Sequence, residues 1–150
     1  MIIDSMKAKG RLNIVLKDQD GNVKDQREVD NLVVTSGLEW IAARMYDTGI
    51  PTEMSHMAVG SGTTAAAAGD TDLESILGSR EALDSTTVST NTVQYVSSFE
   101  AGDGTGAVTE AGIFNAATSG TMLCRTVFDV VNKGANDTLS ITWTITISAS

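Results

Sequence analysis

His56 and Cys124 are the only histidine and the only cysteine in the chain, and together they could form a nucleophilic pair. In such a pair the imidazole activates the thiol, whose sulfur then attacks an electrophilic carbon. Neither residue lies in a local pattern typical of a cysteine enzyme. Cys124 shares strand parity with Met122 and Phe128, so we expect a buried cysteine, a histidine at a strand end and no catalytic pair.

Asp18, Asp20 and Asn22 have the alternate spacing of the first oxygen ligands in a calcium-binding loop. Such a loop has glycine at the sixth position and glutamate at the twelfth, whereas here Gly21 is fourth and Val29 is twelfth. We therefore expect a hairpin turn here, and neither a metal nor a cofactor.

Glu110 stands in the otherwise apolar stretch 107–114. A carboxylate inside such a strand must be paired or lie at the surface, because burying an unpaired charge is costly. We expect a structural ion pair, Glu110 with Arg125 or with Arg80, and no acid–base catalysis.

Two glycine-rich segments could in principle hold phosphates. One contains Gly102, Gly104 and Gly106 around Asp103, and the other is the tripeptide 60–62. The first follows a strand without leading into a helix and carries no lysine, and the second is a lone Gly-x-Gly. We expect loops between strands at both places, so no catalytic or cofactor-binding residue is predicted.

The elements that position these residues are mostly strands. The clearest is the C-terminal run, where apolar and hydroxylic residues alternate with a period of two, as in a strand with one buried face; its apolar members are Leu139, Ile141, Trp143, Ile145 and Ile147. Other strands are predicted at residues 11–17, 22–29, 56–59, 86–99, 107–116 and 121–131. Turn residues predict one hairpin around 18–21 and a C-terminal hairpin around 132–137.

One helix is expected at about residues 36–46. Ser36 and Glu39 fit a capping box, which satisfies free backbone donors in the first turn of a helix. The apolar stripe predicted to pack on the sheet consists of Leu38, Ile41, Ala42 and Met45. A single helical turn is also predicted at 70–76.

These elements favour a mainly β fold: a single-domain antiparallel β-sandwich, jelly-roll-like, with one short helix. The domain covers residues 1–150, and residues 1–10 are expected to form an N-terminal arm. The 150-residue chain has a net charge of −9, concentrated in residues 51–150. An acidic body repels phosphate backbones, so direct nucleic-acid binding is not expected. The sequence also indicates neither a secretion signal nor a membrane span.

Long blocks of the sequence resemble a family of small virion structural proteins of tailed bacteriophages. The blocks are NLVVTSGLEWIAARM at 31–45, HMAVGSGTTAAAAGDTDLES at 56–75, EAGIFNA at 110–116, GTMLCRTVF at 120–128 and NKGANDTLSITWTITIS at 132–148. The resemblance implies a non-enzymatic protein of the virion, assembled in the cytoplasm of a host bacterium.

Within that family we expect a capsid decoration (cement) protein on the outer capsid surface. Such a protein would form a homotrimer, or else a dimer, and stabilise the lattice of the major capsid protein. Lys7, Lys9 and Arg11 are the candidate capsid-docking residues, because they could contact an acidic capsid surface. The alternative is a structural component of the tail, neck, baseplate or fibre base.

Overall fold

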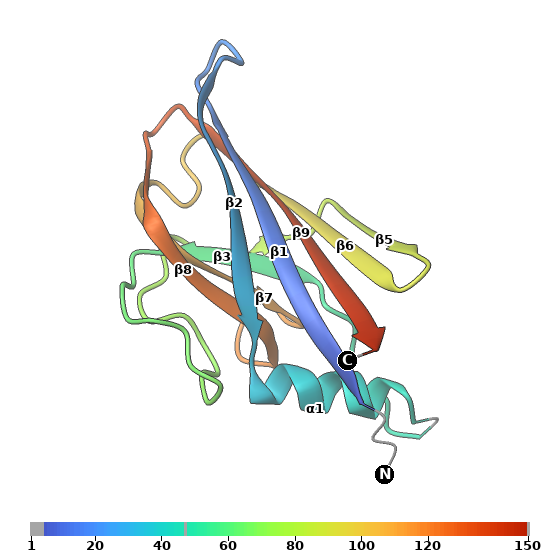
Figure 1. Cartoon of the computed structure of the whole chain (residues 1–150). Helices are drawn as coiled ribbons and strands as arrows, with labels where there is room; N and C mark the ends of the chain where they lie inside the picture. The colour runs from blue at the N-terminus through green and yellow to red at the C-terminus, as the bar shows by residue number, and fades with distance from the viewer. Residues whose placement is uncertain (1–4, 47, 150) are drawn as a thin grey trace.

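The computed structural model describes residues 5–46 and 48–149 and shows one antiparallel sheet with a short helix at one end (Figure 1). The strands are β1 (Met6–Lys17), β2 (Val23–Val33), β3 (His56–Gly60), β4 (Glu81–Ala82), β5 (Ser85–Ser89), β6 (Thr92–Phe99), β7 (Gly106–Phe114), β8 (Met122–Lys133) and β9 (Thr138–Ala149), and the helix is α1 (Thr35–Arg44). The expected mainly β, antiparallel fold with one short helix is confirmed.

The sheet has the strand order β4-β3-β7-β8-β2-β1-β9-β6-β5 and curls as a half-barrel. Two walls therefore face each other across the core, β3, β7 and β8 on one side and β1, β9 and β6 on the other (Figure 1). β2 joins them, because it pairs with β1 along most of its length and with β8 only at Leu32 and Val33. The two layers expected of a sandwich are here two halves of one curled sheet.

The core lies between these walls. β9 buries every second residue, as its alternation predicts, and the buried side chains are Leu139, Ile141, Trp143 and Ile145. They pack with Leu12, Ile14 and Leu16 of β1 and with Met57, Val59, Ile113, Leu123 and Cys124 of the opposite wall. Full burial of one such aliphatic side chain stabilises the fold by about 1.5–3 kcal/mol.

The hairpin expected around residues 18–21 is confirmed, because β1 and β2 are antiparallel neighbours. The C-terminal hairpin is wrong: β8 pairs with β7 and β2, whereas β9 pairs with β1 and β6. The segment between β8 and β9 crosses from one wall to the other, so both strands face the same core from opposite sides. Residues 86–99 form two strands, β5 and β6, because Thr90 takes a left-handed backbone conformation in a tight turn.

Helix α1 begins one residue earlier than predicted, at Thr35, and ends at Arg44. The capping box is wrong, because Ser36 lies inside the helix and its hydroxyl donates to the carbonyl oxygen of Met122 at 2.9 Å. The packed face is also different: Gly37 is buried and Trp40 and Ile41 contact the core. Of the four residues expected to pack on the sheet, only Ile41 does so, and Leu38, Ala42 and Met45 are exposed.

The prediction of an N-terminal arm at residues 1–10 is wrong for residues 6–10. These residues are part of β1 and pair with β9 from Met6 to Gly10. Residues 1–4 lie outside the described residues. Gly10 is needed in this pairing because the side chain of Asn31 crosses over it: a Cβ atom at Gly10 would lie 1.7 Å from Asn31 Oδ1. That oxygen accepts a hydrogen bond from the buried Trp143 indole at 2.8 Å.

The outer face of β3, β7 and β8 is covered by the loop between β3 and β4, residues 61–80. Leu73 from this loop packs on a second small cluster made of Val34, Ala58, Phe114 and Met122. β7 and the start of β8 are therefore buried on both faces, which explains their nearly continuous apolar sequence. The helical turn predicted at 70–76 is wrong, since this segment is irregular loop.

Candidate functional site

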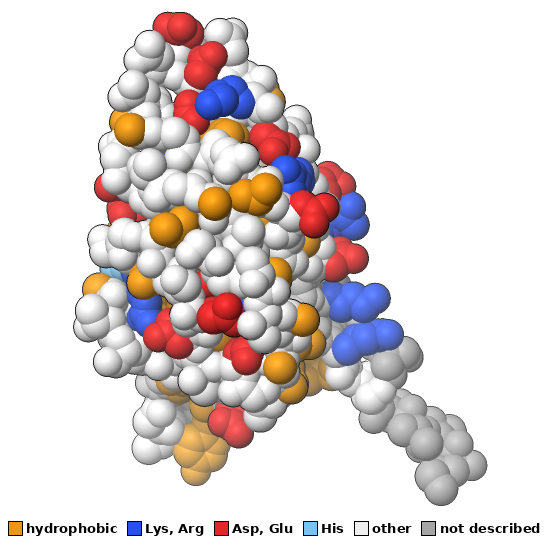
Figure 2. Space-filling view, turned by 90° about the vertical axis from the view of Figure 1, so that its left-hand side faces the viewer, with side chains coloured by type: hydrophobic (Ala, Val, Ile, Leu, Met, Phe, Trp, Pro, Cys, Tyr) orange, Lys and Arg blue, Asp and Glu red, His pale blue; other side chains and the backbone are white. Residues whose placement is uncertain are grey.

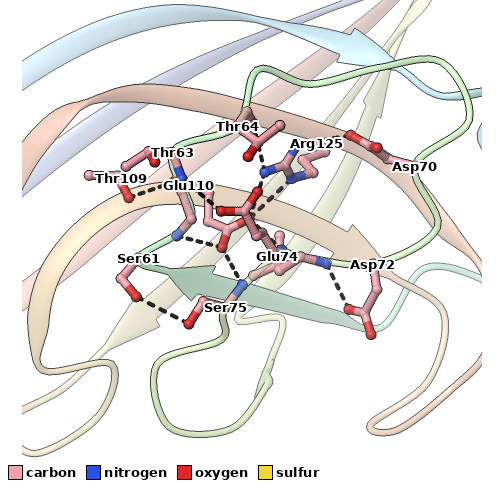
Figure 3. A network of polar contacts seen from close by, with 12 residues as sticks. Ser61, Thr63, Thr64, Asp70, Asp72, Glu74, Ser75, Thr109, Glu110 and Arg125 are labelled. Carbon is pink, nitrogen blue, oxygen red and sulfur yellow. Dashed lines mark hydrogen bonds and ion pairs between the residues drawn. The ribbon is translucent and has the colours of Figure 1, made fainter.

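A dense group of polar side chains lies under the 61–80 loop and is centred on Glu110 of β7 and Arg125 of β8 (Figure 3). The ion pair expected between these two residues is present: Arg125 Nε donates to Glu110 Oε1 at 3.0 Å. The Glu110 side chain is fully buried and that of Arg125 is 3% exposed. We call these two residues, with Asp70, the Glu110–Arg125 cluster.

Backbone groups of the loop complete the surroundings of the Glu110 carboxylate. Its Oε2 atom accepts hydrogen bonds from the amides of Gly62 and Ser75, both at 2.8 Å. Its Oε1 atom accepts one from the amide of Glu74 at 2.9 Å in addition to the bond from Arg125. Each carboxylate oxygen thus has two donors, which is about what a carboxylate oxygen can accommodate.

Arg125 uses its remaining donors on the same loop. Nη1 contacts the Asp70 carboxylate at 2.8 Å, and Nη2 donates to the carbonyl oxygen of Thr64 at 3.0 Å. Asp70 in turn accepts a bond from the amide of Ala67 at 2.9 Å. The planar guanidinium therefore ties together β7, β8 and the middle of the loop.

The 60–62 tripeptide has a structural reason that the sequence did not reveal. A Cβ atom at Gly60 would lie 2.6 Å from Glu110 Oε2, and one at Gly62 would lie 2.4 Å from it. Only glycine lets the backbone approach the carboxylate closely enough for the Gly62 amide to donate to it. The Thr109 hydroxyl adds a bond to the Gly62 carbonyl oxygen at 2.7 Å.

These contacts assign the cluster to holding the loop against the sheet. Glu74, at the cluster's rim, accepts a hydrogen bond from the Thr64 side chain, which lowers the pKa of the Glu74 carboxyl. Arg80, the other partner considered for Glu110, instead lies 3.6 Å above the Phe114 ring and donates to the carbonyl oxygens of Ala116 and Ser119.

His56 and Cys124 lie on opposite faces of the sheet. On the intervening strand β7, His56 is opposite Phe114 and Cys124 is opposite Ile113, and these adjacent residues point to different sides. Burial raises the pKa of the Cys124 thiol well above its ordinary value, so the thiolate needed for attack is disfavoured. The buried cysteine is confirmed, and the structure does not bring the pair together.

The 18–22 segment is the hairpin turn that the sequence predicts. Asp18 Oδ1 accepts hydrogen bonds from the amides of Asp20 and Asn22, both at 2.9 Å, and these bonds lower the pKa of the Asp18 carboxyl. In residues 5–46 and 48–149, no group of histidine, cysteine or acidic side chains is arranged to hold a metal ion. The glycine-rich segment is a loop at residues 100–105 between β6 and β7, and Gly106 begins β7.

The three candidate docking residues lie on β1 and are exposed. Arg11 is already paired, since it contacts Glu28 at 2.6 Å, and this hydrogen bond raises the pKa of the guanidinium. Lys7 and Lys9 have no ion-pair partner among the residues that the structure describes. They are closer to the start of β1 than Arg11 is, and that start lies at the same end of the molecule as α1 (Figure 1).

The α1 end also exposes large apolar side chains, and Figure 2 shows some hydrophobic side chains at the lower end of the molecule. Met45 is 75% exposed, and the other exposed members are Leu38, Tyr46 and Ile50. We call these four residues, with Lys7 and Lys9, the α1-end surface. Sequence reasoning missed its apolar part because it placed Leu38 and Met45 in the core.

Comparison of the chain with protein-family models, with curated proteins and with solved structures finds no match. Among the described residues, no helix is long and apolar enough to cross a membrane.

Proposed function

We propose that this protein is a non-enzymatic structural component of a tailed-phage virion, and specifically a capsid decoration (cement) protein. In this role it oligomerises on the outer surface of the head and stabilises the lattice of the major capsid protein. The α1-end surface is the observation that carries the proposal. In the described part of the chain, this end of the molecule carries both large exposed apolar side chains and lysines without ion-pair partners.

The α1-end surface fits an acidic capsid surface that has apolar patches. Burial of apolar side chains such as Met45 supplies affinity, and two lysines steer the approach of an otherwise acidic chain. Arg11 contributes less than the sequence suggests, since Glu28 already neutralises it.

The Glu110–Arg125 cluster supports the proposal because it makes the fold resistant to deformation. Its side chains are saturated by contacts inside the fold, and they fix a long loop to the wall of the half-barrel. A decoration protein must resist deformation when the shell pushes outwards, and many copies repeated by symmetry then add their contacts.

The test is binding of the purified protein to heads that lack it. We expect the protein to sediment with such heads and to raise the temperature at which they release DNA. A Lys7→Ala, Lys9→Ala, Met45→Ser variant should bind much more weakly. Its matched control is Lys17→Ala, which removes an exposed lysine from the opposite end of β1.

No binding to heads would overturn the proposal. A copy number in intact virions that is far below the number of capsid subunits would also contradict it. A protein found in only a few copies, at the tail, neck or baseplate, would then be the alternative structural component.

A further inference from the structure

Strand β5 forms an edge of the sheet that lacks most of the usual protection against pairing with another strand. All five of its residues, Ser85–Ser89, are exposed. It contains no proline and no lysine, and its pairing with β6 has no bulge. Natural edge strands use such features to avoid joining other chains. The opposite edge, β4, is only two residues long and contains Glu81.

Strands β5 and β6 themselves carry no charged side chain, and the exposed Asp84 immediately precedes β5. Residues 85–99, which include β5 and β6, contain no charged residue, and neither do residues 138–150, which include β9. In a chain with net charge −9, most approaches of a second copy bring carboxylates together. Two β5 edges meet with less of that repulsion, because the paired strands carry no charged side chain. This favours a second copy of this chain as the occupant.

An apolar row leads across the sheet to this edge. Ile145 of β9 is opposite Val93 of β6, and Val93 is opposite Val88 of β5. Ile145 is buried, Val93 packs partly against the core, and Val88 is 70% exposed. The row thus ends in an apolar side chain at an edge that still has backbone groups to pair.

We propose that two copies pair through β5, antiparallel about a twofold axis, with Val88 opposite Val88 of the second copy. The pairing joins the two sheets, uses the outward-facing backbone groups of β5 and covers both valines. An isologous contact of this kind closes as a dimer. This inference rests on the proposed function, because that function places the oligomer on the head. Of the homotrimer and the dimer expected there, the β5 pairing favours the dimer.

Five residues a side make a weak contact in solution, so the test traps transient dimers by disulfide formation. Val88→Cys places two thiols at directly opposite positions, where the separation of Cα atoms in an antiparallel pair suits a disulfide. The control is Val23→Cys, another exposed apolar position, on β2. The native Cys124 is buried and does not interfere.

We expect Val88→Cys to form disulfide-linked dimers several-fold faster than Val23→Cys in a glutathione redox buffer, at a rate that rises with protein concentration. Equal rates would overturn the inference. So would cross-linking of Val88→Cys only to a capsid protein on heads, because another strand would then occupy the edge.

A second variant separates this inference from the proposed function. Val88→Lys places a charge on the edge and should abolish self-association in sedimentation experiments, whereas Val23→Lys should not. The α1-end surface is intact in both variants. If Val88→Cys formed no cross-links while heads still bound the protein, only the inference of a β5 dimer would be contradicted. If cross-links formed but the protein did not bind heads, only the proposed decoration role would be contradicted.

Discussion

At the scale of single residues, the buried Glu110–Arg125 pair matters more for the integrity of the fold than any exposed ion pair does. Removing one partner of a buried pair leaves an uncompensated charge, whereas exposed pairs are screened by water. Arg125 also supplies the donors for Asp70 and for the Thr64 carbonyl oxygen. Its loss therefore frees the loop as well as the carboxylate.

Arg125→Ala should lower the free energy of unfolding by about 3–5 kcal/mol, because Glu110 stays buried without its cationic partner. The matched control is Arg11→Ala, which removes an arginine from an exposed pair with Glu28 and should change stability little. Urea unfolding followed by tryptophan fluorescence measures both. Equal effects of the two substitutions would contradict the assigned role of the cluster.

The Cys124 thiol should be unreactive in the folded protein even at mildly alkaline pH, because burial raises its pKa. In the unfolded chain the thiol ionises near a pH of about 8.5, whereas in the folded chain it stays neutral. The unfolded state therefore binds fewer protons above that pH, and stability falls as the pH rises. Labelling with a chromogenic disulfide should need denaturant, while an exposed Val88→Cys thiol reacts at once.

At the scale of elements, packing overrides helix propensity in α1. The helix crosses one end of the half-barrel and lies directly on β8 at Gly37, where a Cβ atom would be 2.0 Å from the carbonyl oxygen of Leu123. This approach lets Trp40 and Ile41 reach the core. It also turns Leu38 and Met45 outwards, which creates the apolar part of the α1-end surface.

Gly37→Ala should therefore destabilise the protein by about 1–3 kcal/mol, the usual cost of overpacking. In an isolated helix the same change would stabilise by about 1 kcal/mol. Glu39→Ala, on the exposed side of α1, serves as the control and should be nearly neutral. Thermal unfolding of the three proteins tests the sign, and a stabilised Gly37→Ala would show that the helix does not pack on β8 as described.

At the scale of the whole molecule, the two proposed contacts differ in electrostatics. Docking on the head brings Lys7 and Lys9 to an acidic partner, whereas pairing through β5 brings together two chains of like net charge. Salt screens attraction in the first case and repulsion in the second.

Raising the salt concentration should thus weaken binding to heads and strengthen self-association. Sedimentation with heads across a salt series measures the salt dependence of head binding. Cross-linking of Val88→Cys across the same series measures the salt dependence of self-association. The Lys7→Ala, Lys9→Ala variant should lose most of the salt dependence of head binding. If salt changed head binding and self-association in the same direction, the assignment of docking to the lysines and of self-association to β5 would be contradicted.

The sequence by itself determined the local features. Alternation in residues 139–147 predicts a strand with one buried face, and Asp18 with Gly21 predicts the β1–β2 hairpin, because both depend on neighbours along the chain. The isolated Glu110 in an apolar strand also predicts an ion pair with Arg125 or Arg80, and the partner is Arg125.

Only the tertiary structure decided which strands pair and which faces are covered. A period of two shows that one face of a strand is buried but not which strand lies beside it, so β8 and β9 could be mistaken for a hairpin. Likewise, the reason for Gly60 and Gly62 lies far away in the sequence, in the Glu110 carboxylate that fills the space where their side chains would be. Contacts between distant segments depend on how the whole chain folds around its core. Local sequence patterns do not determine these contacts, because they depend only on neighbouring residues.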